Sequence, residues 1–272
     1  MSLDVKLTLS VIIPCYKVNE NYQYLNELLN SIIFQKESIF QIIQIILIND
    51  SPELNLISYI EPVYHTKILI LNNKINSGQA FSRNKGSQFA IGEYLHFIDQ
   101  DDIIAIDYYK SIIEIKDIII SNCYLFKNNN YVRLYKFHRI LIYKFLNKIN
   151  YLKFFLIFDN IILSPGQAIF KKEIFIKLKG FPVLDKYGSD DYGLMFNFAK
   201  NNFNYNFYPE AIFFHRLHPS QGKQHLNMDE SKKNFFLTVY PKTTFSKLCN
   251  NDFVIIKFMK KITYVFFNNR IF

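Results

Sequence analysis

Tryptophan is missing from the sequence, and only 3 of its 272 residues are cysteines. Cys15, Cys123 and Cys249 are widely spaced and odd in number, which argues against a disulfide scaffold and fits a reducing compartment. No cysteine or histidine spacing matches a structural zinc site. A small disulfide-rich or zinc-stabilised domain is therefore not expected.

Long uncharged apolar segments are also missing. A transmembrane helix needs about 18 such residues, and the nearest candidate, residues 140–163, is interrupted by Lys144, Lys148, Lys153 and Asp159. Residues 1–6 are polar and lack the apolar stretch of a signal peptide. We therefore expect no membrane span, no signal peptide and a cytoplasmic location.

The balance of residue types indicates a folded, basic protein. Half of the residues are hydrophobic and 20% are charged, which is enough apolar surface for a sizeable core. The formal charge of +9 and the pI near 9.2 are typical of proteins that meet nucleic acid, anionic lipid or phosphorylated substrates. Charge alone does not choose among these partners.

Strand-like and helix-like segments alternate along the first hundred residues. Strands are expected at 9–14, 42–48, 67–71 and 94–98, and helices at 21–34 and 77–90. This alternation predicts an α/β fold with a doubly wound, mostly parallel sheet. Ligands bind beyond the carboxyl ends of such strands, where Pro14, Asp50 and Asp99 are expected.

The rest of the chain gives weaker signals. Residues 123–126 and 131–135 could pair as a hairpin, and 168–170 and 206–214 read as strands. Helices are expected at 140–158, 173–179 and 192–200.

Asp99, Asp101 and Asp102 form the sharpest polar feature. Three carboxylates within four residues repel one another unless a cation lies among them, and oxygen ligands favour Mg²⁺ or Mn²⁺ over zinc. Such a metal would neutralise a diphosphate leaving group. The alternative is a solvated turn that caps the next helix.

A second polar feature is the segment NSGQAFSRNKG at residues 76–86. Gly78 lets the backbone approach a ligand near a helix start, and Arg83 could contact phosphate with two hydrogen bonds. The alternative is an ordinary helix with an exposed basic residue.

Together with two further motifs, these features resemble the family 2 glycosyltransferases, inverting enzymes with the GT-A fold. The motifs that carry the resemblance are SVIIPCY at 10–16, INDS at 48–51, NSGQAFSRNKG at 76–86 and GEYLHFIDQDD at 92–102. Looser matches are GQAIFKK at 166–172, GFP at 180–182, GSDDY at 188–192 and RLHPS at 216–220.

The resemblance implies roles on the donor side of the site. Asp50 would hydrogen-bond the nucleotide base, Asp99 would contact the ribose, and Arg83 would help to bind the donor. The other donor contacts that it implies come from Pro14, Tyr16, Asn76, Gly78 and Gln100.

The resemblance also implies the metal ligands and the base. Asp101 would bind Mn²⁺ or Mg²⁺, and His218 would lie near the metal or the diphosphate. Asp191 would be the general base that deprotonates the acceptor hydroxyl, with Asp190 as the alternative. Judged without the resemblance, Asp190 and Asp191 read as caps of the following helix.

Some residues depart from the family pattern. The turn at 49–52 is Asn-Asp-Ser-Pro where the family has Asp-Asp-Gly-Ser, and Lys17 stands in place of asparagine. Asp190 replaces a glutamate, which leaves the choice of base open. Without tryptophan there is no Gln-x-x-Arg-Trp motif, which argues against a processive synthase of the cellulose type.

The predicted organisation assigns residues 1–110 to the nucleotide-sugar half of a GT-A domain, 111–225 to the acceptor and catalytic half, and 226–272 to a basic amphipathic extension. Residues 253–267 carry apolar side chains on one helical face, and they could lie on an anionic membrane at the cytoplasmic face of the inner membrane or pack on the domain.

The predicted function is transfer of a sugar from a nucleotide diphosphate sugar, with uridine diphosphate expected, to a glycan or glycolipid acceptor. A bacterial surface glycan precursor such as lipooligosaccharide or capsule is expected by family analogy. One alternative is a nucleotidyltransferase of similar fold, although residues 14–17 are not the basic Gly-rich loop that it needs. Another is a non-enzymatic nucleic-acid-binding protein, although no known binding module is present and no nucleic-acid partner is expected.

Overall fold

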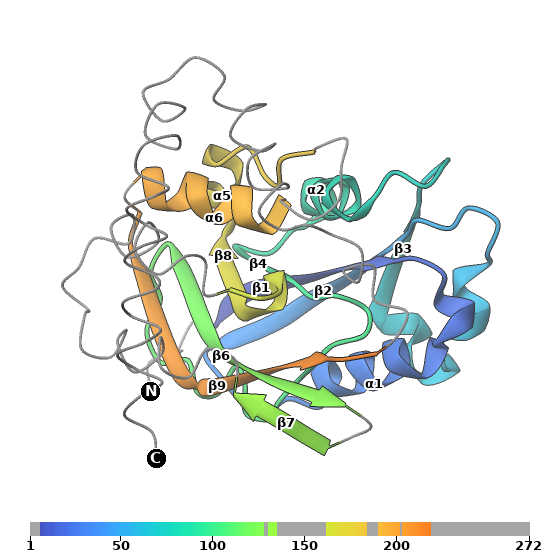
Figure 1. Cartoon of the computed structure of the whole chain (residues 1–272), viewed down its shortest axis with the longest axis horizontal. Coiled ribbons are helices and arrows are strands. Elements are labelled where there is room, and N and C mark those ends of the chain that lie inside the picture. Colours follow the sequence, from blue (N-terminus) through green and yellow to red (C-terminus); the bar gives the residue numbers. More distant parts are fainter. Residues whose placement is uncertain (1–5, 128–129, 135–161, 184–189, 202, 219–272) are drawn as a thin grey trace, which may run out of the picture. The chain divides into compact units, whose positions relative to one another are not determined.

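The computed structural model describes residues 6–127, 130–134, 162–183, 190–201 and 203–218. The chain divides into two compact units. The first comprises residues 1–135, 162–181 and 203–219 and contains the sheet in Figure 1. The second comprises residues 136–161, 182–202 and 220–272 and contains the helix α6 (Asp190–Lys200).

A 9-stranded mixed sheet forms the centre of the first unit. Its order is β3-β2-β1-β4-β8-β6-β9-β5, and β7 pairs with β6. The strands are β1 (Leu7–Cys15), β2 (Phe40–Asn49), β3 (Ile68–Asn72), β4 (Tyr94–Phe97), β5 (Ile103–Ile104), β6 (Ile118–Lys127), β7 (Asn130–Leu134), β8 (Ala168–Lys171) and β9 (Tyr205–Arg216).

Helices and short 3₁₀ turns connect these strands. The α-helices of this unit are α1 (Tyr22–Ile33), α2 (Gln79–Phe89) and α5 (Lys172–Lys177). The 3₁₀ turns are η1 (Val18–Glu20), η2 (Leu56–Tyr59), η3 (Pro62–Lys67) and η4 (Pro165–Gln167).

The four strands β3-β2-β1-β4 are parallel, and α1 and α2 lie on opposite faces of this part of the sheet (Figure 1). β1 sends Leu9, Val11 and Ile13, all fully buried, into the same core as α1. On the other face a Cβ on Gly86 of α2 would come within 2.5 Å of Ile12 Cγ2. Successive strand residues point to opposite faces, so the same strand supports both helices.

Beyond β4 the pairing becomes mixed. β8 runs antiparallel to both β4 and β6, whereas β6 and β9 are parallel to each other. The hairpin predicted from 123–126 and 131–135 is confirmed as β6 and β7. The predicted α/β fold is therefore confirmed, but the sheet is mixed and not mostly parallel, because β8 and the short strands β5 and β7 pair in the antiparallel direction.

Two predicted helices, 140–158 and 253–267, lie outside the described residues, as does the extension 226–272. The division at residue 110 into donor and acceptor halves stays a prediction. In the part of the chain that the structure describes, no helix is long and apolar enough to cross a membrane.

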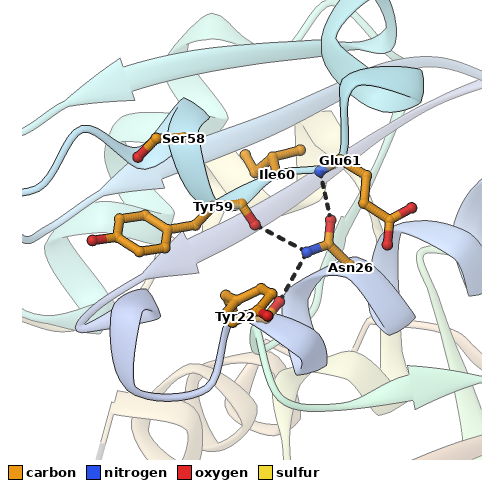
Figure 2. Close-up of a pocket in the computed structure, with 6 residues that line it drawn as sticks. All are labelled: Tyr22, Asn26, Ser58, Tyr59, Ile60 and Glu61. Carbon is orange, nitrogen blue, oxygen red and sulfur yellow. Dashed lines mark hydrogen bonds between the residues drawn. The ribbon is translucent and has the colours of Figure 1, made fainter.

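Asn26 ties α1 to the connection between η2 and η3, as Figure 2 shows. Its Nδ2 donates to the carbonyls of Tyr22 and Tyr59 at 3.1 and 2.9 Å, and its Oδ1 accepts from the Glu61 N–H at 2.9 Å. These groups line a hollow of about 390 Å³ together with Ser58 and Ile60. The start of α1 is therefore held by these hydrogen bonds as well as by its packing in the core.

His96 of β4 is a buried polar residue. The Gly166 carbonyl, which can only accept, lies 2.8 Å from Nε2, so Nε2 carries the hydrogen and Nδ1 accepts from the Tyr109 hydroxyl at 2.8 Å. Burial lowers the pKa of His96 to about 4, and the bond to the Gly166 carbonyl acts in the opposite direction. The folded protein therefore keeps this imidazole neutral.

We expect the free energy of unfolding to fall as the pH drops below about 6.5. The unfolded chain binds a proton at His96 near pH 6.5, whereas the folded chain resists until about pH 4. The stability linked to this group is complete above pH 6.5 and is lost as the pH falls, by about 2 kcal/mol between pH 7.5 and 5. Urea denaturation at both pH values measures the loss. If the free energy of unfolding of His96→Gln falls as much between pH 7.5 and 5 as that of the wild type, other titrating groups are responsible.

Candidate active site

Pro14 separates the loops that follow β1 and β4. Parallel pairing of these strands runs to Ile12 and Phe97, and the Ile98 N–H still donates to the Ile12 carbonyl at 3.0 Å. The next bond of a parallel ladder would come from residue 14, and proline has no N–H to donate. The segments that follow β1 and β4 can therefore diverge at the carboxyl edge of the sheet, where the predicted site lies.

Gln100 joins these two loops again through its side chain. Its Oε1 accepts from the Tyr16 N–H and its Nε2 donates to the Tyr16 carbonyl, both at 2.8 Å. This reciprocal pair fixes the backbone of Tyr16, whose side chain is 43% exposed. Gln100 thus holds a loop in the structure, and its predicted donor contact stays a prediction.

Asp50 organises the turn that leads into α2. Its Oδ1 accepts from the Ser77 N–H and from Asn73 Nδ2, each at 2.7 Å, and its Oδ2 accepts from the Gly78 N–H at 2.8 Å. Gly78 has a φ of 84°, and its N–H also lies 3.2 Å from Asn76 Oδ1. A carboxylate offers about four acceptor positions, so one remains for the predicted contact with a base.

Arg83 is fully buried on α2 and supports Asp99. Its Nη2 forms an ion pair with Asp99 Oδ1 and lies 3.3 Å from Gln79 Oε1, and its guanidinium packs 5.2 Å from the Phe181 ring centre. Its side chain is 1% exposed. In the structure Arg83 therefore contacts the Asp99 carboxylate. Its predicted contact with the donor stays a prediction.

Asp101 and His218 meet although 117 residues separate them in the sequence. Asp101 Oδ2 lies 2.6 Å from His218 Nε2, and the two side chains are 19% and 12% exposed. Within the described residues, no group of three or more His, Cys, Asp or Glu side chains is arranged to hold a metal ion. The pair still fits Mn²⁺ or Mg²⁺, since Mg²⁺ typically takes one or two protein ligands and completes its shell with water and phosphate oxygens.

Asp102 is oriented inward, in contrast to Asp101. It has no exposed surface, and its Oδ1 lies 3.0 Å from His215 Nδ1 and accepts from the Arg216 N–H at 3.0 Å. Burial raises the pKa of the Asp102 carboxyl, while the His215 imidazole acts in the opposite direction. Of the adjacent carboxylates, Asp101 is therefore the one available to a ligand, and Asp102 holds the loop.

Ser164 connects two carboxylates of the loop at residues 99–102, which follows β4 and is called the acidic loop below. Its hydroxyl lies 3.2 Å from Asp99 Oδ2 and 3.2 Å from Asp102 Oδ2, and it can donate its single hydrogen to one of them at a time. Ser164 was not among the predicted site residues. The available signal was the Ser-Pro-Gly turn at 164–166, which is too common to indicate a site.

Asp190 and Asp191 lie in the first turn of α6, in the second compact unit. The helix predicted at 192–200 thus begins two residues earlier than expected, and both aspartates are helical residues. Carboxylates are favourable in the first turn because the amino end of a helix carries partial positive charge. Adjacent helical residues point about 100° apart, so the two carboxylates face different directions.

The sheet and the loops at its carboxyl edge together define a GT-A glycosyltransferase fold. The sequence profile described as glycosyl transferase family 2 matches residues 10–179, which include Asp50, Arg83, Asp99 and Asp101. The chain belongs to glycosyl transferase family 2. This membership does not support the nucleotidyltransferase and nucleic-acid-binding alternatives.

Several relatives share part of the sequence. The chain is 34% identical over 110 residues to the minor teichoic acid biosynthesis protein GgaB of Bacillus subtilis, covering 40% of this chain and 12% of that protein. It is 35% identical over 137 residues to the glycosyltransferase GlyA of Streptococcus pneumoniae, covering 47% and 18%. The chain thus spans less than a fifth of either relative.

Solved structures show the same fold. S. aureus TarS, residues 1–349, in complex with UDP has a TM-score of 0.58 and 20% identity, covering 92% of this chain and 75% of that chain. The complex of the same protein with UDP-GlcNAc has a TM-score of 0.59 and 19% identity, covering 92% and 76%.

Proposed function

We propose that the chain is an inverting, metal-dependent glycosyltransferase that moves a sugar from a UDP-sugar to a hydroxyl of a surface glycan precursor. The observation that carries this proposal is the Asp101–His218 pair at the carboxyl edge of the sheet. Its position beside the loops of Tyr16 and Asp50 fits a diphosphate group that follows a bound nucleoside.

Asp101 and His218 are the residues that would hold Mn²⁺ or Mg²⁺. When bound, such a cation supplies charge stabilisation to the departing diphosphate. The nitrogen ligand favours Mn²⁺, because Mg²⁺ binds mainly oxygen. Arg83 and Ser164 hold Asp99, and His215 holds Asp102, so the loop that carries Asp101 is braced before any ligand arrives.

The donor side offers one exposed ring and one organised carboxylate. Tyr16 can stack on a nucleobase, and the remaining acceptor position of Asp50 suits the N3 hydrogen of uracil. The TarS complexes with UDP and UDP-GlcNAc add support, since that protein shares the fold. A uridine diphosphate sugar is therefore the proposed donor.

The acceptor side rests on Asp191, with Asp190 as the alternative. An inverting transfer requires a single base that removes the proton of the acceptor hydroxyl. It requires no covalent nucleophile. The name of the GgaB relative, a teichoic acid biosynthesis protein, supports a surface glycan as acceptor. Lipooligosaccharide, capsule and contact with an anionic membrane remain proposals from the sequence.

Nucleotide binding tests the proposal. We expect UDP with Mn²⁺, at 100 times its Kd, to stabilise the protein by about 2.7 kcal/mol relative to the ligand-free protein, because a ligand stabilises only the state that binds it. GDP or dTDP at the same concentration should stabilise it less. Thermal unfolding and calorimetry measure the effect. Tighter binding of GDP or dTDP than of UDP would overturn the uridine assignment.

A further inference from the structure

Arg216, the last residue of β9, is an almost fully buried cation next to Asp101 and His218, which are called the candidate metal pair below. Its side chain is 5% exposed. It lies two residues before His218 in the sequence, and its own groups reach the acidic loop after β4 and the helix α1. Its contacts therefore join segments that are far apart in the sequence.

Arg216 holds the acidic loop by main-chain and side-chain bonds. Its N–H donates to Asp102 Oδ1 at 3.0 Å, and its Nε donates to the main-chain carbonyl of Asp101 at 2.7 Å. The second bond is made to the residue whose carboxylate meets His218. Moving the guanidinium would consequently move the backbone of Asp101.

The other end of the guanidinium is held by α1. Its Nη2 pairs with Glu27 Oε2, and its Cζ lies 4.0 Å from the Tyr24 ring centre and 4.5 Å from that of Phe126. The Tyr24 ring also lies 5.6 Å from the His218 ring. Tyr24 therefore contacts both the arginine and the histidine of the candidate metal pair.

The helix that supplies these contacts is itself fixed. Leu25 and Leu28 of α1 are buried in the main core, Asn26 bonds the η2–η3 connection (Figure 2), and Ser31 Oγ accepts from the Ile104 N–H at 3.3 Å. Ile104 belongs to the short strand that follows the acidic loop. Glu27 and Tyr24 thus offer Arg216 a rigid attachment.

We propose that Arg216, anchored by Glu27 and Tyr24 on α1, is the positioning residue that sets the Asp101–His218 pair for cation binding. The inference rests on the proposed metal dependence. Arg216 acts through Asp101 and His218 and needs no contact with the cation or the donor. Lysine cannot replace it, because a point charge lacks both the Nε donor directed at Asp101 and the planar face that packs on Tyr24 and Phe126.

The affinity for Mn²⁺ in the absence of donor tests this role. We expect Arg216→Lys to weaken the Mn²⁺ Kd by about 10-fold or more, since outer-shell partners of metal ligands typically contribute 10–100-fold. Glu27→Gln should weaken it in the same direction by less. The double variant should lose less than the product of the single losses, because both substitutions disrupt one linkage. Titration of Mn²⁺ followed by electron paramagnetic resonance measures the Kd values.

Ile45→Ala is the matched control. It removes packing from the same core, but Ile45 lies on β2 and takes no part in the contacts of Arg216 described above. We expect it to lower the urea midpoint while the Mn²⁺ Kd stays within about twofold of the wild type, on the expectation that affinity follows the linkage and not stability. A Kd loss in Ile45→Ala equal to that in Arg216→Lys would overturn the positioning role. An unchanged Kd in Arg216→Lys would overturn it too.

Failure of the proposed metal dependence is distinguishable from failure of this inference. If the wild-type protein binds no Mn²⁺ at millimolar concentration, either alone or with saturating UDP, the metal proposal is wrong and the positioning role falls with it. If the wild type binds Mn²⁺ and Arg216→Lys binds it equally well, only the positioning role is wrong.

Discussion

Replacing Asp101 by alanine is expected to abolish glycosyl transfer while the protein stays folded. The Asp101 side chain is 19% exposed and its carboxylate contacts His218, so the substitution opens no core cavity. Loss of a metal ligand removes charge stabilisation worth several kcal/mol. Since each 1.36 kcal/mol is tenfold in rate, turnover should fall by about 10³-fold or more.

Release of UDP and formation of product, both followed with Mn²⁺ in excess, measure this loss, and urea denaturation checks the fold. Asp107→Ala is the matched control, because that aspartate is 46% exposed and lies 3.8 Å from Lys36 on the surface. It should keep wild-type turnover. Full activity of the wild-type protein in excess chelator, or of Asp101→Ala itself, would contradict the metal-dependent mechanism.

The parallel half of the fold could be predicted because its signals are local. Leu9, Val11 and Ile13 alternate with Ile12 along β1, and the strand is apolar on both sides because α1 and α2 cover both faces. The position of β8 could not be predicted in the same way. It is a strand of 4 residues whose antiparallel place between β4 and β6 depends on segments distant in the sequence.

The candidate site was predictable in its residue types more than in its contacts. Asp101 and His218 were expected to share a cation, and the structure brings them within 2.6 Å. Arg83 and Gln100 were expected to contact the donor, and the structure shows that they also support Asp99 and the Tyr16 backbone, which the sequence did not indicate. A sequence shows that a side chain is charged or polar, whereas the tertiary fold decides whether its partner is a ligand or a neighbouring loop.

The residues that brace the acidic loop were missed for the same reason. Ser164, His215 and Glu27 belong to three different segments of the chain and become neighbours of the loop only in the folded protein. The composition of the loop does not distinguish Asp102 from Asp101, whereas burial in the folded protein does: Asp102 has no exposed surface and the Asp101 side chain is 19% exposed. This burial makes Asp102 a support for the loop.

Replacing Asp191 by asparagine is expected to lower turnover by about 10²-fold or more, the usual contribution of a general base. Asparagine keeps the size and hydrogen-bonding capacity of the side chain but cannot accept the acceptor's proton at neutral pH. The Kd for UDP should change little, because the proposed base acts on the acceptor hydroxyl and has no proposed contact with the nucleotide. Single-turnover kinetics with a saturating donor separate the chemical step from donor binding.

Asp190→Asn is the matched variant for this test. Both aspartates lie in the first turn of α6, so each substitution removes one negative charge from the same end of the same helix. Their effects on helix stability should therefore be alike, about 0.3–1 kcal/mol. Their effects on turnover should differ, because side chains about 100° apart cannot both face one hydroxyl. Inactivity of Asp190→Asn with near-normal turnover of Asp191→Asn would move the base one residue back. Equal, small losses in both variants would reduce the pair to a helix terminus and remove the proposed base from this segment.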